Sequence, residues 1–90
     1  MTNLKQALYT QEIARLDAIV GEYSGRPAGA NPGVSAFVTE KLKAARVALK
    51  KRDEETAWLS LYGAAKFCQN NQVQPEKTVL SVARINRLLA

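Results

Sequence analysis

The side chains of this chain that could bind or react are mostly cations, and they gather in one short segment. Residues 41–52 contain basic side chains and no acidic one. Lys43, Arg46 and Lys50 are spaced by three and four residues, which places them in a stripe on one face of a helix. Such a stripe attracts anions, either nucleic-acid phosphates or an acidic protein face. The alternative is a solvated helix face followed by a basic helix end that suits the helix dipole.

Groups that commonly carry catalysis are scarce in this sequence. There is no histidine and there is one cysteine, Cys68, so the commonest general base and the usual zinc ligands are missing. A Cys68 nucleophile would need a base partner, and its place near the end of an apolar helix is typical of a buried cysteine. The acidic pair Glu54-Glu55 is a feature of a helix start. We therefore expect no enzymatic activity, no cofactor and no catalytic, cofactor-binding or metal-binding residue.

Size and composition predict a small globular protein. Ninety residues make one domain, near the lower limit for a single hydrophobic core, and 47% hydrophobic residues is ordinary for a folded protein. No apolar run reaches the roughly 18–20 residues that cross a bilayer. The N-terminus lacks the charged start and apolar block of a signal peptide, and one cysteine cannot form an internal disulfide. We expect a single domain over residues 1–90, located in the cytoplasm and without a membrane partner.

Helical periodicity defines the elements that must position the basic residues. We expect an all-α fold, a small bundle of about four helices over residues 3–23, 34–51, 54–70 and 76–89. Residues 24–33 contain three glycines and two prolines and predict a flexible loop. The change from Lys-Lys-Arg to Asp-Glu-Glu at Asp53 marks a helix–helix turn, because cations suit helix ends and anions suit helix starts. This turn makes the second and third helices a central hairpin.

The ends of the helices are marked by local signals. Thr2 or Asn3 is expected to cap the first helix and Asp53 the third. The second helix begins either with Asn31 as the cap and Pro32 in its first position, or with Ser35 as the cap. A proline at the start and an acidic side chain in the first turn predict the beginning of the fourth helix, at Pro75 and Glu76.

Apolar side chains at helical spacing predict which faces are buried. The first helix has a narrow apolar seam formed by Tyr9, Ile13, Leu16, Val20 and Tyr23. Leu4, Leu8 and Ile19 widen this seam. The second has a line at Val38, Leu42, Ala45 and Leu49, extended by Val34 and Phe37. The third is apolar on nearly every side around Trp58, so we expect it to be the central helix. The fourth is expected to turn Val79, Val82, Ala83 and Leu89 inward, with Leu80 and Ile85, and to expose Lys77, Ser81 and Arg84.

These features favour a non-catalytic protein that acts by binding. It would be an adaptor, a regulator or a stoichiometric inhibitor, of the kind that mobile genetic elements encode, and its partner would be a protein or a protein–nucleic-acid complex with an acidic surface. Self-association into a homodimer would use the surplus of apolar helix surface. The expected contact residues are basic ones from the loop, the stripe with its flanks, and the last helix: Arg26, Lys41, Lys43, Arg46, Lys50, Lys51, Arg52, Lys77 and Arg84.

The alternative function is that of a DNA- or RNA-binding regulator. Residues 64–82 resemble a helix-turn-helix, because Pro75 opens a helix after an apolar helix and a polar turn. The resemblance covers about a fifth of the chain, and its turn is about two residues longer than usual, with Asn70-Asn71 and no central glycine. It implies that the stripe on the second helix meets phosphates. It also implies that three residues of the fourth helix face the major groove: Lys77, Ser81 and Arg84.

Overall fold

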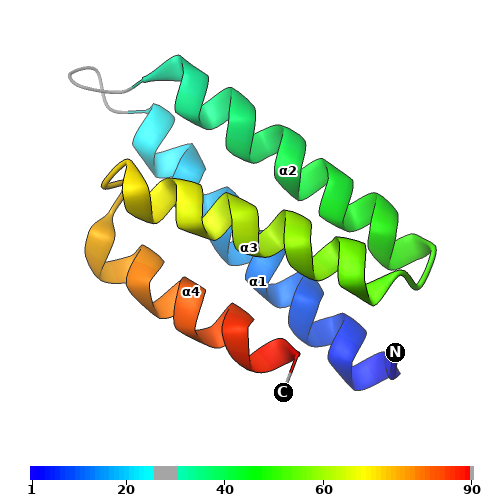
Figure 1. The fold of residues 1–90 in the computed structure, drawn as a ribbon. Coiled ribbons are helices and arrows are strands. Elements are labelled where there is room, and N and C mark those ends of the chain that lie inside the picture. The colour runs from blue at the N-terminus through cyan, green and yellow to red at the C-terminus, as the bar shows by residue number, and fades with distance from the viewer. Residues whose placement is uncertain (26–30, 90) are drawn as a thin grey trace.

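The computed structural model describes residues 1–25 and 31–89. Within them the chain forms four helices and no strand: α1 (Asn3–Ser24), α2 (Pro32–Lys50), α3 (Glu54–Asn70) and α4 (Pro75–Leu88). Consecutive helices run in opposite directions, so that the start of α1 and the end of α4 lie toward the same end of the bundle (Figure 1). This confirms the predicted all-α bundle. The expected contact residue Arg26 lies outside the described residues.

The four helices form a ring in chain order. Each helix packs against the next, and α4 closes the ring against α1. The hairpin of α2 and α3 has the most extensive contact, and α1 and α3 also touch across the centre. By contrast α2 and α4, whose residues are all described, do not contact each other. Each of α1 and α3 therefore contacts all the other helices, whereas α2 and α4 lie on opposite sides of the bundle.

The core is built from one line of side chains on each helix. Tyr9, Leu42, Leu61 and Ile85, one from each helix, are at most 1% exposed. Trp58 is only partly buried, but its ring stacks on that of Tyr62 with 4.6 Å between centroids. Its indole N–H donates to the carbonyl oxygen of Ile85 at 2.8 Å, which ties α3 to α4. The aromatic residue thus has an apolar contact and a partner for its polar atom, as partly buried indoles require.

Local hydrogen bonds explain where the helices start. The side chain of Thr2 accepts from the amide of Lys5 at 3.1 Å, and that of Asp53 accepts from the amide of Thr56 at 3.2 Å. Hydrogen bonding to Thr56 lowers the pKa of the Asp53 carboxyl. Asn31 accepts from the amide of Gly33 at 2.9 Å, with Pro32 in the first helical position. This selects Asn31 over Ser35 as the cap, so α2 begins at Pro32 and not at residue 34.

The ends of α2 and α3 share one motif. Arg52 and Gln72 have left-handed backbones, with φ of 58° and 56°. In each case the next residue donates its amide back to the helix, from Asp53 to the carbonyl of Ala48 and from Val73 to the carbonyl of Cys68, both at 2.9 Å. This is the Schellman arrangement, which satisfies carbonyls that would otherwise be orphaned. The α3 motif also buries Val73 completely, so the turn before α4 is held by packing as well as by hydrogen bonds.

The orientation of α4 differs from the prediction. Thr78 and Ser81 are fully buried, whereas Val79, Leu80 and Leu89 are 48%, 57% and 51% exposed. Val82 and Ile85, also predicted to face inward, are 9% and 0% exposed, so the prediction was right for these two residues and wrong for the other three. The reason is a polar contact with α1, which turns Ser81 and Arg84 inward and is described below.

The first turns of α1 also differ from the prediction, because Leu4 and Leu8 are 72% and 41% exposed. They were expected to widen the buried seam. Helix α4 has 14 residues against 22 in α1, a difference of about 12 Å at 1.5 Å per residue, and it ends before the start of α1 (Figure 1). The first turns of α1 therefore have no complete cover on this side.

The two faces of α3 give a direct test of the packing. Leu61 is fully buried, so Leu61→Ala should lower the free energy of unfolding by about 2–5 kcal/mol through lost transfer energy and a cavity. Leu59 is 57% exposed, and Leu59→Ala should change it by less than about 0.5 kcal/mol. Urea unfolding followed by circular dichroism measures both. Equal losses in the two variants would show that α3 is oriented differently.

Candidate binding groove between α1 and α4

The basic residues of the predicted stripe lie on the outer surface of α2, but not all of them are free. Lys43 and Lys50 are exposed and have no hydrogen-bond or ion-pair partner among the described residues. The Nη2 atom of Arg46 lies 3.2 Å from Oδ2 of Asp17 on α1. Both members of this pair are about half exposed, so it is worth at most about 1 kcal/mol.

The flanks of the stripe are used in different ways. The Nζ atom of Lys41 lies 5.5 Å from the centre of the Phe37 ring, a cation–π distance. Arg52 donates to the carbonyl oxygen of Met1 at 3.1 Å and to Oδ1 of Asn3 at 3.4 Å, which fastens the N-terminus to the α2–α3 turn. Lys51 is exposed at the end of α2. Around the stripe, the exposed cations that form no hydrogen bond or ion pair through their side chains in the described residues are thus Lys43, Lys50 and Lys51.

The two predicted contact residues of α4 lie elsewhere. Lys77 and Arg84 face α1, while the stripe is on α2, across the bundle from α4. The structure therefore separates the predicted residues into two groups and does not bring them onto one surface. In addition, α3 and α4 lie side by side in opposite directions (Figure 1). A helix-turn-helix would instead cross its helices at about 90–120°.

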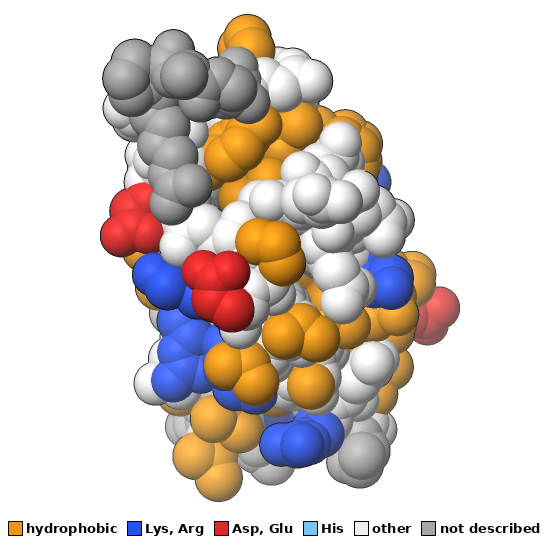
Figure 2. Space-filling view, turned by 90° about the vertical axis from the view of Figure 1, so that its left-hand side faces the viewer, with side chains coloured by type: hydrophobic (Ala, Val, Ile, Leu, Met, Phe, Trp, Pro, Cys, Tyr) orange, Lys and Arg blue, Asp and Glu red, His pale blue; other side chains and the backbone are white. Residues whose placement is uncertain are grey.

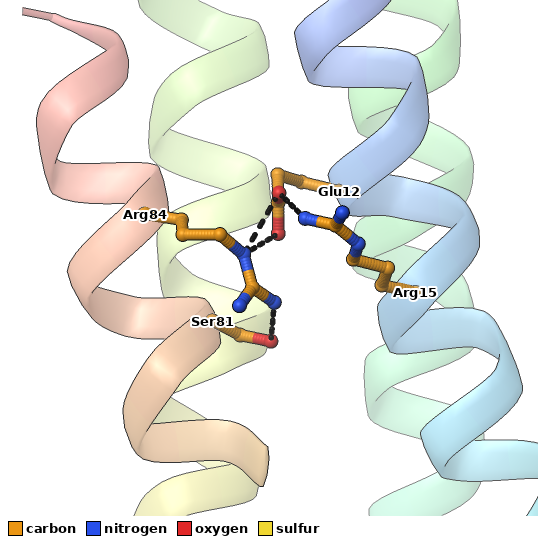
Figure 3. Close-up of polar contacts among 4 residues, drawn as sticks. All are labelled: Glu12, Arg15, Ser81 and Arg84. Atoms are coloured by element: carbon orange, nitrogen blue, oxygen red, sulfur yellow. Dashed lines mark hydrogen bonds and ion pairs between the residues drawn. The ribbon is translucent and has the colours of Figure 1, made fainter.

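A buried carboxylate joins α1 to α4. Glu12 is only 4% exposed, and the Nε atom of Arg84 donates to both of its oxygens at 3.0 Å. Arg15 also donates to Glu12, from one turn further along α1. The Nη2 atom of Arg84 donates to the hydroxyl of Ser81 at 3.3 Å (Figure 3). This cluster was not predicted, although the sequence holds a signal for it: Glu12 lies three residues after Tyr9 and four before Leu16, within the buried seam.

Charge compensation explains why this carboxylate can be buried. A buried ion is destabilising unless it is paired and its lone pairs are used. Glu12 has two guanidinium partners, so the cluster keeps one net positive charge. The side chains of Arg15 and Arg84 are 42% and 35% exposed, so both reach the surface. Apart from the hydrogen bond of Arg84 to Ser81, their remaining N–H groups have no partner in the described part of the chain, and the contact with Glu12 holds them in place.

A hollow of about 280 Å³ opens beside this cluster. Its walls come from α1 and α4 only: Arg15, Ala18, Ile19, Glu22, Lys77, Leu80 and Arg84. We call it the Arg15 hollow. Leu80 is 57% exposed here, between the charged side chains of Lys77 and Arg84.

Gln74 holds the helices together at the far end of this hollow. It is 6% exposed and has a left-handed backbone with φ of 43°, where a side chain is strained. Its side-chain amide does not cap α4 but donates to the carbonyl of Ile19 at 3.3 Å and to the carboxylate of Glu22 at 2.6 Å. Lys77 lies 3.4 Å from the same carboxylate. The hollow is therefore bounded by polar contacts that pin α4 to α1.

A second hollow, of about 270 Å³, lies along the same pair of helices where α4 ends. We call it the Leu4 hollow, and its lining residues are Thr2, Leu4, Lys5, Leu8, Arg87 and Leu88. The two hollows share no lining residue, but both lie between α1 and α4, and we call the pair the α1–α4 groove. On the face drawn in Figure 2, hydrophobic side chains reach the surface with basic and acidic ones beside them. The bundle thus has apolar surface that is open to solvent and bordered by charge.

A third hollow, between α3 and the end of α4, has the opposite charge. It measures about 510 Å³ and is lined by Glu54, Glu55, Trp58, Leu59 and Leu89. Glu54 lies 3.1 Å from Nζ of Lys5 and accepts from the Tyr9 hydroxyl at 3.1 Å. The hydrogen bond to Lys5 lowers the pKa of Glu54, while burial and this carboxylate raise the pKa of Tyr9. Glu54 thus links α3 to α1 through Lys5 and Tyr9.

Burial raises the pKa of the Cys68 thiol to about 11, so it is protonated and weakly nucleophilic at neutral pH. Within residues 1–25 and 31–89, no three His, Cys, Asp or Glu side chains are grouped as a metal site would need. No helix in those ranges is both long and apolar enough to span a membrane.

Comparison of the chain with protein-family models, curated proteins and solved structures finds no match.

Removing the charge of Glu12 tests the cluster. Glu12→Gln leaves two guanidinium groups without their counter-charge, so we expect the free energy of unfolding to fall by about 1–3 kcal/mol, less than for a fully buried pair because both arginines reach solvent. Asp17→Asn removes the acid of the exposed ion pair with Arg46 and should lower the free energy of unfolding by less than about 1 kcal/mol. Urea unfolding measures both. If Glu12→Gln costs no more than Asp17→Asn, the cluster does not hold α4 to α1.

Proposed function

We propose that this protein is a non-catalytic binding module that holds a macromolecular partner in the α1–α4 groove. The observation that carries the proposal is the exposure of leucines in this groove beside ordered cations. Leu4, Leu8 and Leu80 are 72%, 41% and 57% exposed. They share the groove with Arg15 and Arg84, whose positions Glu12 sets.

Burial of these leucines would provide free energy for association. Apolar surface removed from water contributes roughly 25 cal/mol per Å². The two arginines add specificity, since their guanidinium groups are already oriented and lose less freedom on binding than mobile side chains do. An adaptor, a regulator and a stoichiometric inhibitor each need only such a surface and no reacting group.

A matched pair of substitutions tests this function. Leu80 and Leu59 have the same exposure, 57%, but Leu80 lines the groove and Leu59 does not. We expect Leu80→Asp to reduce capture of the partner from extracts of the native host at least about tenfold, as seen by quantitative mass spectrometry. Leu59→Asp should capture it like the wild-type protein. If folded Leu80→Asp retains every partner, or if both variants lose the same partners, the groove is not the contact surface.

A second candidate function is nucleic-acid binding through the outer surface of α2. It is favoured by Lys43, Lys50 and Lys51, which are exposed and form no ion pair in the described residues. Such lysines can contact nucleic-acid phosphates whatever the base sequence. Since α4 does not share this surface, it would add no base contacts to the same duplex.

Salt dependence and charge reversal test this second function. Three phosphate contacts predict a slope of about −3 for log affinity against log salt concentration on random duplex DNA. The triple variant Lys43→Glu, Arg46→Glu, Lys50→Glu should abolish the binding, whereas Leu80→Asp should preserve it. Fluorescence anisotropy measures the affinities. Absence of binding at about 50 mM salt, or equal binding by the folded triple variant, would rule this function out.

A further inference from the structure

The geometry and charge of the α1–α4 groove point to one class of occupant. We propose that the groove receives an amphipathic α-helix of a partner protein, with acidic residues at its centre and apolar residues on either side. This inference rests on the proposed function, because it names the partner of that same groove.

The shape of the groove fits a helix. Two neighbouring antiparallel helices form its walls, and a third helix can lie along such a groove with side chains at spacings of three and four pointing into it. The apolar ends of the groove are marked on α1 by Leu4 and Ala18. These positions are 14 residues apart, which corresponds to about 21 Å at 1.5 Å per residue. A partner helix of about four turns would cover both hollows.

The order of side chains along the groove sets the pattern of the occupant. Leu4 and Leu8 offer apolar surface at one end, and Ala18 and Leu80 offer it at the other. Arg15 and Arg84 meet at Glu12 between them (Figure 3). A matching helix has an apolar residue, two acidic residues and another apolar residue, spaced by four, three and four. Its apolar residues then lie about 16 Å apart, and its carboxylates can reach guanidinium N–H groups.

The charge of the groove selects against other occupants. Its lining includes four cations besides Lys5, which pairs with Glu54. The four are Arg15, Lys77, Arg84 and Arg87. Glu22 and the buried Glu12 oppose them, which leaves a net charge of +2. A symmetric dimer through this groove would place the same positive surfaces against each other. A nucleic acid would neutralise the cations but would leave the exposed leucines uncovered.

A selection from displayed peptides tests the occupant without a known partner. The library consists of 20-residue helical peptides in which one face is randomised. We expect the peptides that bind the wild-type protein to be enriched in Asp or Glu at the centre of the face, with Leu, Ile, Met or Phe on both sides, and to become helical by circular dichroism when bound.

Variants then assign the site of the selected peptides. Binding of a synthetic selected peptide, measured by fluorescence anisotropy, should weaken at least about tenfold with Leu80→Asp and with Arg87→Glu. It should be unchanged in two matched variants outside the groove, Leu59→Asp and Lys66→Glu. Replacement of the central acids of the peptide by Gln should weaken binding to a similar extent, because the ion pairs with the arginines are lost.

The outcomes separate the two proposals. The helix inference is overturned if no peptide is enriched, if the enriched peptides lack the acidic centre or the helical form, or if they bind Leu80→Asp as well as the wild-type protein. In each of these cases a native partner that is captured by Leu59→Asp but not by Leu80→Asp would still support the groove as the binding surface. Growth of the free protein into larger species with concentration, by light scattering, would instead indicate that the groove receives the acidic hollow of a second copy.

Discussion

The need to compensate a buried carboxylate governs how α4 packs. Glu12 is 4% exposed, and its charge has to be balanced by groups within hydrogen-bond distance. One of these groups, Arg84, belongs to α4, so α4 can pack on α1 only with Arg84 and the neighbouring Ser81 turned toward Glu12. Leu80 lies four residues before Arg84, on the same side of α4, and is left 57% exposed at the Arg15 hollow. The polar contact thus places an exposed leucine beside the two arginines.

The sequence predicted the helices well because their ends depend on nearby residues. Asn31 and Asp53 accept hydrogen bonds from amides in the first turn that follows, and Pro75 begins α4 with a fixed φ and no N–H to satisfy. The apolar lines of α1 and α2 repeat at helical spacing. The rotation of α4 could not be obtained in this way. That rotation depends on a contact between Glu12 and Arg84, which are 72 residues apart in the sequence. The spacing of apolar side chains carries no information about this contact.

The candidate groove could be predicted only in part, for a related reason. Lys77 and Arg84 were expected to contact a partner from their charge, but on an outer face and together with α2. Leu4 and Leu8 were expected to be buried, and their exposure follows from the different lengths of α1 and α4. Which helix lies beside which, and where the shorter one ends, is a property of the assembled bundle. Local patterns supply the residues of the groove but not their placement.

The two basic surfaces of the molecule are suited to different tasks. Lys43 and Lys50 on α2 have no partner among the described residues, so ordering them against a ligand would cost side-chain entropy and salt would screen them. Such cations accelerate encounters more than they define a complex. Arg15 and Arg84 are already ordered by Glu12 and stand beside apolar surface. The groove is therefore the surface on which a ligand gains both apolar burial and oriented hydrogen bonds, which is what selective binding requires.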